Sequence, residues 1–309
     1  MKAMPGKDVL PRSIFHYTDA AGFLGILQSR TIWVSDSLFL NDLQEMKYAA
    51  SVLADVMCTR IAQVSTSQAH RERLDDLKEW LDLRIGTGGA PTVFTENSPL
   101  IASFCESGDI LSMWRSYSAS SGFSIEFDTD VISECLAVSS CPSGMGPSCF
   151  GLTTNESENL WAANFDLSAV ISTVSYDGES TRNDMQALVD QMLSTFDQLQ
   201  LDGEPGFPEW VFPELAKHKH PAFAEEREVR IIAVRPSCLA SPPNLRVARG
   251  HLVPYRGIVF PFCAIKSVTV GPGPLKTRSA SALRQRFLAG GRGEWSHVAI
   301  LESEAPFAP

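Results

Sequence analysis

FHYTDAAGFLGIL, residues 15–27, is the stretch that decides how this chain begins to fold. Its first four residues predict a short strand that ends in His-x-Thr, so that one imidazole and one hydroxyl lie at the edge of a sheet. A tight helix packed beneath this strand is predicted by four residues at helical spacing, Ala20, Phe23, Leu24 and Leu27. Asp19 precedes this helix and is a candidate N-cap, because its carboxylate can accept from the first free backbone N–H groups.

The chain has 309 residues, of which 44% are hydrophobic, so it can bury a sizeable core. We expect residues 1–309 to form a single α+β domain. Residues 1–12 are rich in charge, Pro and Gly and are predicted to be a loose lead-in. Residues 138–159 are rich in Ser, Gly and Pro and are predicted to be a surface loop or insertion.

Composition excludes several classes of protein. No apolar run reaches the roughly 20 residues that a membrane-spanning helix needs, and no apolar region follows the N-terminal charges as in a signal peptide. We therefore expect a cytoplasmic protein. The net charge of −10 argues against an extended surface that binds a phosphate backbone, but it does not exclude a local basic groove. The seven cysteines lack zinc-site spacing, so we interpret them as reduced thiols and predict no metal site.

The remaining strands and helices follow without a regular βαβ rhythm. This order predicts an α+β fold with mixed, mainly antiparallel sheets and flanking helices. Strands are expected at residues 31–35, 100–105, 123–128, 170–176, 225–234, 258–260, 265–270 and 298–301. Helices are expected at residues 46–57, 74–81, 110–117, 184–201 and 279–288, with Asp109 as the cap of the third.

Three polar sets are candidates for chemistry. The first is His16 with Thr18, and the second is Asn41-Asp42 with Glu45. The third lies on the strand expected at residues 225–234, where Glu226, Glu228 and Arg230 would project to one face. Each set also has an ordinary structural interpretation: a polar residue at a strand edge, a turn or helix cap, or a solvated strand face.

Trp114 and Tyr117 lie on the helix expected at residues 110–117. Aromatic residues at this spacing usually pack in a core. They could instead form a platform for a ligand, and both interpretations stay open here.

These motifs in this order resemble a known family, the bacterial domain-of-unknown-function family 2971. The resemblance covers nearly the whole chain. One departure is Leu43, where Pro is expected after Asn-Asp. The motifs that carry the resemblance are His16-Tyr17-Thr18 before an Ile-Leu helix, Asn41-Asp42-x-x-Glu45, Ser103-Phe104 before Met113-Trp114-x-x-Tyr117, Gly122-Phe123-x-Ile125-x-Phe127, Glu226-x-Glu228-x-Arg230, Val270-Gly271-Pro272 and Ser303-x-x-Pro306.

A more distant resemblance suggests a reaction. The His-x-Thr strand with its helix, and the late Glu226-x-Glu228, are similar to elements of ADP-ribosyltransferases. This resemblance implies an ADP-ribosyltransferase-like core and NAD as the substrate, with Glu228 and Glu226 as catalytic residues. The residues that it implies for NAD binding are His16, Tyr17, Thr18, Asn41, Asp42, Trp114, Tyr117 and Arg230.

Breaking the bond between nicotinamide and ribose builds oxocarbenium character on the sugar, as glycoside cleavage does. Glu228 would stabilise that charge, and Glu226 would orient or deprotonate the acceptor. Arg230 would hold the carboxylates or meet the diphosphate, and His16 would orient NAD. We expect ADP-ribose transfer to a macromolecular acceptor, nucleic acid or protein.

Three alternatives remain at this point. The first is an NAD glycohydrolase, in which water replaces the acceptor. The second is a non-enzymatic sensor or interaction module on the same fold. The third is metal-dependent chemistry at Asp42, Glu45, Glu226 and Glu228, because carboxylate clusters suit Mg²⁺.

Overall fold

The computed structural model describes residues 9–40, 43–85, 98–118, 122–139, 167–199, 210–234, 242–248, 250–288 and 295–306. The strands are β1 (Ser13–Thr18), β2 (Thr31–Asp36), β3 (Leu100–Cys105), β4 (Phe123–Asp128), β5 (Ser168–Thr173), β6 (Glu228–Val234), β7 (Asn244–Ala248), β8 (His251–Val259), β9 (Ile265–Val270) and β10 (Ala299–Glu302). The α-helices are α1 (Ala20–Ser29), α2 (Leu43–Ala62), α3 (Gln68–Ile85), α4 (Leu111–Tyr117), α5 (Thr129–Ser139), α7 (Gly178–Leu199), α8 (Val211–Leu215) and α9 (Lys276–Leu288). Short 3-10 helices lie at Ser37–Phe39, Pro221–Glu226 (η2) and Phe262–Ala264.

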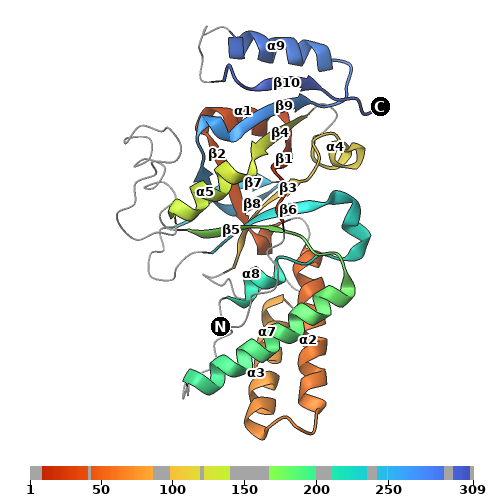
Figure 1. Ribbon diagram of the computed structural model, residues 1–309, viewed down its shortest axis with the longest axis vertical. Helices are drawn as coiled ribbons and strands as arrows, with labels where there is room; N and C mark the ends of the chain where they lie inside the picture. The colour runs from red at the N-terminus through yellow and green to blue at the C-terminus, as the bar shows by residue number, and fades with distance from the viewer. Residues whose placement is uncertain are drawn as a thin grey trace.

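The described strands form one branched sheet of ten strands in the order β10-β9-β4-β1-β3-β2-β8-β7, with β6 joined to β3 and β5 joined to β6. Its pairs are antiparallel apart from β10 with β9. In Figure 1, α9 lies beyond β10 at one end of the molecule, and α2, α3 and α7 lie together at the other. The predicted α+β class with mainly antiparallel pairing is confirmed.

Strand β3 is the branch point of the sheet. One edge pairs with β6 along its full length. The other edge is shared: Ile101 and Leu100 pair with β2, whereas Cys105 pairs with Phe15 of β1. Strands β1 and β2 therefore diverge beside the middle of β3, around Ser103.

Two buried clusters stabilise the fold on opposite sides of this sheet. One cluster packs α1, α5 and α9 on the face that carries Phe104, Val229 and Ile231. The other packs α2, α3, α7 and α8 on Ile101 and Ile232, which project from the opposite face. The helices at the lower end of Figure 1 thus cover only part of the face that carries Ile101. None of the described helices is long and apolar enough to cross a membrane.

Many locally determined elements agree with the sequence predictions. Strand β1, helix α1 and strand β2 form in that order, and Asp19 Oδ1 accepts from Gly22 N at 2.7 Å as the predicted cap. The buried face of α1 was partly wrong: Phe23 and Ile26 are buried, whereas Leu24 is 51% exposed. The predicted cap at Asp109 was also wrong. Its carboxylate accepts instead from Trp114 Nε1, and α4 has no side-chain cap.

Other differences concern whole elements. Helix α5 and most of the β7–β8 hairpin were not predicted, and β6 begins at Glu228 rather than at residue 225. Residues 138–139 of the predicted loop end helix α5, whereas 140–159 lie outside the described residues. Most of the predicted lead-in, residues 1–8, also lies outside them.

Candidate functional site

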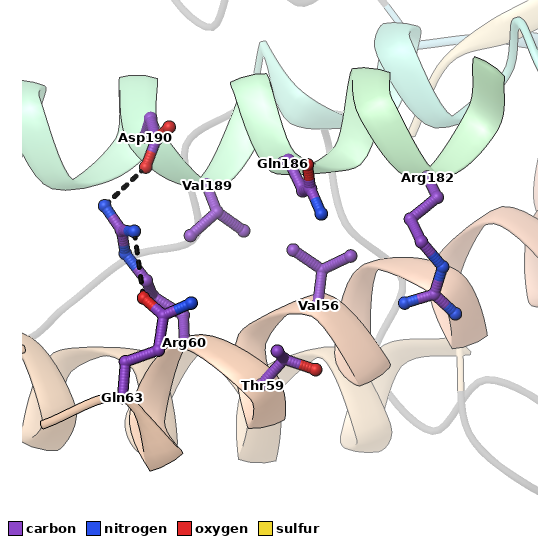
Figure 2. A pocket seen from close by; sticks show the side chains of 8 residues that line it. All are labelled: Val56, Thr59, Arg60, Gln63, Arg182, Gln186, Val189 and Asp190. Atoms are coloured by element: carbon purple, nitrogen blue, oxygen red, sulfur yellow. Dashed lines mark hydrogen bonds and ion pairs between the residues drawn. The ribbon is translucent and has the colours of Figure 1, made fainter. Parts of the chain in front are cut away.

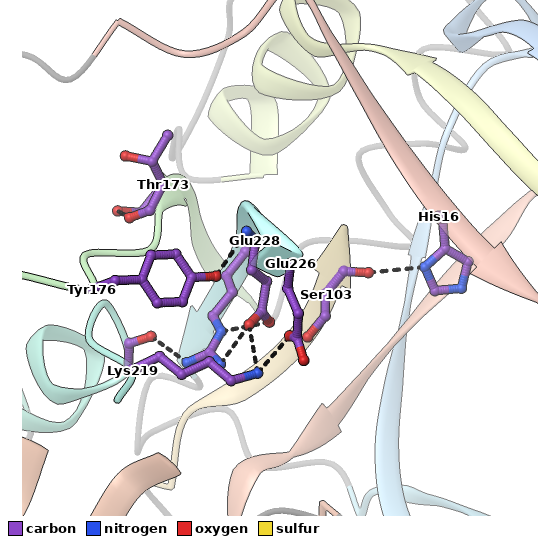
Figure 3. A network of polar contacts seen from close by, with 10 residues as sticks. His16, Ser103, Thr173, Tyr176, Lys219, Glu226 and Glu228 are labelled. Atoms are coloured by element: carbon purple, nitrogen blue, oxygen red, sulfur yellow. Dashed lines mark hydrogen bonds and ion pairs between the residues drawn. The ribbon is translucent and has the colours of Figure 1, made fainter. Parts of the chain in front are cut away.

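Four charged side chains meet where β6 begins (Figure 3). Arg230 binds Glu228 through two hydrogen bonds, Nε to Oε1 at 2.8 Å and Nη2 to Oε2 at 2.9 Å. Lys219 Nζ donates to Glu226 Oε2 at 2.7 Å and to Glu228 Oε2 at 3.2 Å. The four formal charges sum to zero. We call Lys219, Glu226, Glu228 and Arg230 the charge network.

The turn before β6 explains how both glutamates reach the same lysine. Glu226 is the last residue of η2, and Arg227 has a left-handed backbone with a φ of 42°. The expectation that Glu226 projects from the strand was therefore wrong. A residue without glycine's freedom rarely adopts a left-handed backbone, so this turn is held by its surroundings. Arg227 O accepts from Glu106 N at 3.2 Å, which ties the turn to the residue that follows β3.

Burial separates the roles of the two carboxylates. The Glu228 side chain is 5% exposed and that of Glu226 is 21% exposed. Burial by itself raises the pKa of Glu228, but Arg230, Lys219 and the Ser103 hydroxyl outweigh it and lower this pKa to about 2. Glu228 thus stays ionised at neutral pH, and Glu226 is the carboxylate of the network that meets solvent.

Neighbouring elements fix the network in place. Arg230 Nη1 donates to Ala216 O at 2.7 Å, which joins β6 to the end of α8. The backbone of Lys219 donates to Ser175 O at 3.0 Å, and Glu228 N donates to the Tyr176 hydroxyl at 2.9 Å. Arg230 holds Glu228, one of the two carboxylates that it was expected to hold, and at 1% exposed it does not reach the surface where a diphosphate would bind.

Sequence reasoning missed Lys219 as part of this site. A lysine in a charged segment is normally solvated, but this one is only 2% exposed. No local spacing links Lys219 to Glu226 or Glu228. The contact forms because η2 folds the segment between them back on itself. Tyr176 was likewise not identified.

His16 lies across β3 from the network (Figure 3). Its Nδ1 is 3.0 Å from Ser103 O, at the point where β1 and β2 diverge. Its ring lies 5.4 Å from the Phe104 ring, on the face opposite to that of Glu228. Because a carbonyl only accepts, Nδ1 carries the proton and Nε2 the lone pair. Burial lowers the pKa of His16, which favours this neutral form.

Tyr17 and Trp114 lie on the same face of the sheet as Glu228, but in a small buried cluster with Cys105. The Tyr17 hydroxyl donates to Ser107 O at 2.9 Å and accepts from Ile110 N at 2.8 Å. Trp114 is 2% exposed. Trp114 therefore follows the core interpretation and Tyr17 packs in the same cluster, whereas Tyr117, at 46% exposed, does not lie in the core.

Thr18 and Tyr117 are more accessible. Tyr117 ends α4 and is 46% exposed. Thr18 Oγ1 lies against the start of α1, where a Cβ on Gly22 would come within 2.1 Å of it. Only glycine at position 22 allows that approach.

The side chains of the second predicted set fall outside the part of the chain that the structure describes. Asn41 and Asp42 lie outside the described residues, and so does the side chain of Glu45. Within the part of the chain that the structure describes, no group of three or more His, Cys, Asp or Glu side chains could hold a metal ion.

A hollow of about 180 Å³ lies elsewhere, between α2 and α7 (Figure 2). It shares no residue with the charge network. Arg60 at its wall donates to Gln63 Oε1 at 3.1 Å and to Asp190 Oδ1 at 2.7 Å. Arg60, Gln63 and Asp190 thus bind one another, and Arg182 and Gln186 also line the hollow.

Comparison with protein families gives a match over part of the chain. The model of the family described as "Protein of unknown function (DUF2971)" matches residues 113–231, a range that contains Tyr117 and the charge network. This supports the family suggested by the motifs, while His16 lies before the matched range. Searches of curated proteins and of solved structures found no significant match.

Proposed function

We propose that this chain is an ADP-ribosyltransferase-like protein that binds NAD and transfers its ADP-ribose to a macromolecular acceptor, nucleic acid or protein. One observation carries the proposal: Cys105 of β3 pairs with Phe15 on one side and with Glu228 on the other. The backbones of two motifs more than 200 residues apart therefore lie two strand spacings apart, about 10 Å, although the His16 ring and the Glu228 carboxylate lie on opposite faces of the sheet.

The divergence of β1 and β2 supports a role for His16. Its Nδ1 proton is engaged by Ser103 O, so Nε2 is the acceptor. Because the ring lies on the opposite face from Glu228, the proposal gives His16 a hydroxyl of NAD other than those of the ribose that Glu228 stabilises. In the proposal His16 orients NAD and takes no proton from it. Thr18, at the end of the same strand, adds a second polar group beside it.

The chemistry follows from the two carboxylates. The bond between the ribose C1′ and the nicotinamide nitrogen breaks, and its electron pair leaves with nicotinamide. An acceptor oxygen or nitrogen then forms a bond to C1′ and loses its proton to Glu226, the more accessible carboxylate. Glu228 stays ionised and stabilises the positive charge on the sugar.

This role requires Lys219 to move. While Lys219 binds both glutamates the network is neutral and offers the sugar no net negative charge. Lys219 lies closer to Glu226, at 2.7 Å, than to Glu228, at 3.2 Å. In the proposal, NAD binding draws Lys219 away from both glutamates, which leaves Glu226, Glu228 and Arg230 with a net charge of −1 beside the sugar.

The test uses NAD labelled in its adenylate part, with the full chain and a cell lysate. We expect label on a macromolecule, release of nicotinamide, and loss of both in Glu228→Gln. Arg182→Gln, at an exposed position of α7, is the matched control and should retain both. Free ADP-ribose without a labelled macromolecule would select the glycohydrolase alternative, and no nicotinamide release in any lysate would refute the proposal.

A second candidate is a non-enzymatic interaction module on the same fold. It is favoured by the near-complete burial of Glu228, whose two carboxylate oxygens are both bound by cations. If this candidate holds, the folded chain cleaves no NAD, and Glu226→Gln leaves its cellular phenotype unchanged. A phenotype lost in that variant while its thermal unfolding is unaltered would argue against the module.

A further inference from the structure

The sheet face that carries Glu228 continues to an aromatic pair, Trp33 and Tyr255, of which Trp33 is exposed and Tyr255 is partly buried. Ser35 of β2 pairs with Tyr255 of β8, and Ile101 of β3 pairs with Ser35. Directly opposite residues share a face, so Trp33, two residues before Ser35, lies on that face beside Tyr255. The two rings are 4.5 Å apart and inclined by 36°.

Trp33 is unusually open for a tryptophan in a sheet. Its side chain is 47% exposed, although burying such a ring is normally favourable. Gly257, which lies directly opposite on β8, contributes no side chain to cover the indole. The helices that cover this face pack on Ile101 and Ile232 instead. No side chain from β8 directly opposite therefore covers the indole ring of Trp33.

A cationic side chain lies next to the pair. Arg246 of β7 donates to Ser35 Oγ through Nε at 3.2 Å and Nη2 at 3.1 Å. Since Ser35 is the register partner of Tyr255, the guanidinium lies on the same face as both rings. We call Trp33, Tyr255 and Arg246 the aromatic–arginine surface.

The charge of this part of the chain is opposite to that of the whole. Strands β7 and β8 contain two arginines, Arg246 and Arg256, and no Asp or Glu, in a chain with 36 acidic residues. Such a segment attracts polyanions. An acidic peptide would satisfy the charge but would offer nothing planar to cover the Trp33 ring. A single-stranded nucleic acid supplies both phosphates and unpaired bases.

We propose that the aromatic–arginine surface binds single-stranded nucleic acid. A base stacks on Trp33 beside Tyr255, and Arg246 neutralises a phosphate. A duplex is a poorer ligand, because its base faces are already stacked.

The surface also bears on the acceptor in the proposed reaction. The strand order β6-β3-β2-β8 separates the charge network from Tyr255 by three strand spacings, about 15 Å. A strand of a few nucleotides spans that length and could bring a base or ribose to Glu226. This link rests on the proposed function, whereas the binding itself does not.

The experiment measures fluorescence anisotropy of labelled 20-nucleotide single-stranded DNA and RNA with the full chain, without NAD. Trp33→Ala should weaken binding by about 5- to 100-fold, the range expected for one lost stacking contact. Arg246→Gln should weaken binding and lower the slope of log affinity against log salt by about 0.7. Leu24→Ala, at an exposed position of α1, is the control and should bind like the wild type.

Three results would overturn the inference: no binding of either nucleic acid at low salt, unchanged binding in both variants, or equally tight binding of a polyglutamate peptide. Thermal unfolding of each variant shows that it is folded. The NAD cleavage assay is run on the same samples. Nicotinamide release without nucleic-acid binding refutes this inference alone, whereas binding without nicotinamide release refutes the proposed reaction alone.

Discussion

Replacing Arg230 by methionine should destabilise the fold strongly. Arg230 is 1% exposed and makes two hydrogen bonds to Glu228 and one to Ala216 O. The change leaves a buried carboxylate with Lys219 as its remaining cation and a buried carbonyl without this donor. Breaking a buried ion pair on one side costs about 3–5 kcal/mol. At about 2–4 °C per kcal/mol, the melting temperature should fall by about 10 °C.

The assay is urea unfolding followed by circular dichroism, with melting curves as a second measure. Arg182→Met, an exposed arginine on α7, is the control and should change stability by less than about 0.5 kcal/mol. Replacing Glu228 by leucine together with Arg230→Met should recover part of the loss, because no unpaired buried charge remains. A loss below about 1 kcal/mol for Arg230→Met alone would refute the view that Glu228 depends on this partner.

The remaining predictions concern pH and local packing. The folded pKa of Glu228, about 2, lies below its ordinary value of 4.5. The contribution of this carboxylate to the free energy of unfolding is therefore present above pH 4.5 and is lost as the pH falls toward 2. Glu228→Gln should flatten the pH dependence of stability to urea across that window. Gly122→Ala should lower the melting temperature, because its Cβ would lie 2.5 Å from Thr18 O. Gly25→Ala lies inside α1, where no atom is within 4 Å of the new Cβ, and should stabilise the fold by about 0.5–1 kcal/mol. Equal changes in the melting temperature of the two variants would contradict both expectations. Asp109→Ala removes the acceptor of Trp114 Nε1 and of Glu304 N, so limited proteolysis should cut the C-terminal segment faster than in the wild type.

Elements set by local patterns were found from the sequence. The apolar spacing and the Asp19 cap identified β1, α1 and β2, and the run at residues 265–270 identified β9. These signals depend on residues within a few positions of one another, and at that range the sequence pattern predicts helices and strands.

The β7–β8 hairpin shows where such patterns fail. Leu245 and Val247 of β7 are 59% and 74% exposed, whereas Arg246 between them is part-buried. The usual alternation is therefore inverted. Pro254 also interrupts β8 and argues against a strand when only the sequence is considered. The pairing of β8 with β2 and of β7 with β8 overrides these two signals.

The sequence alone determined the α+β class, the order of most elements and the two motifs around His16 and Glu228. Only the tertiary structure decided that Lys219 joins Glu226 and Glu228, and that the His16 ring lies on the opposite face from Glu228. Both facts depend on which strands neighbour β3 and on how η2 folds back. Such contacts between distant residues are set by the packing of the whole chain, and no local spacing encodes them.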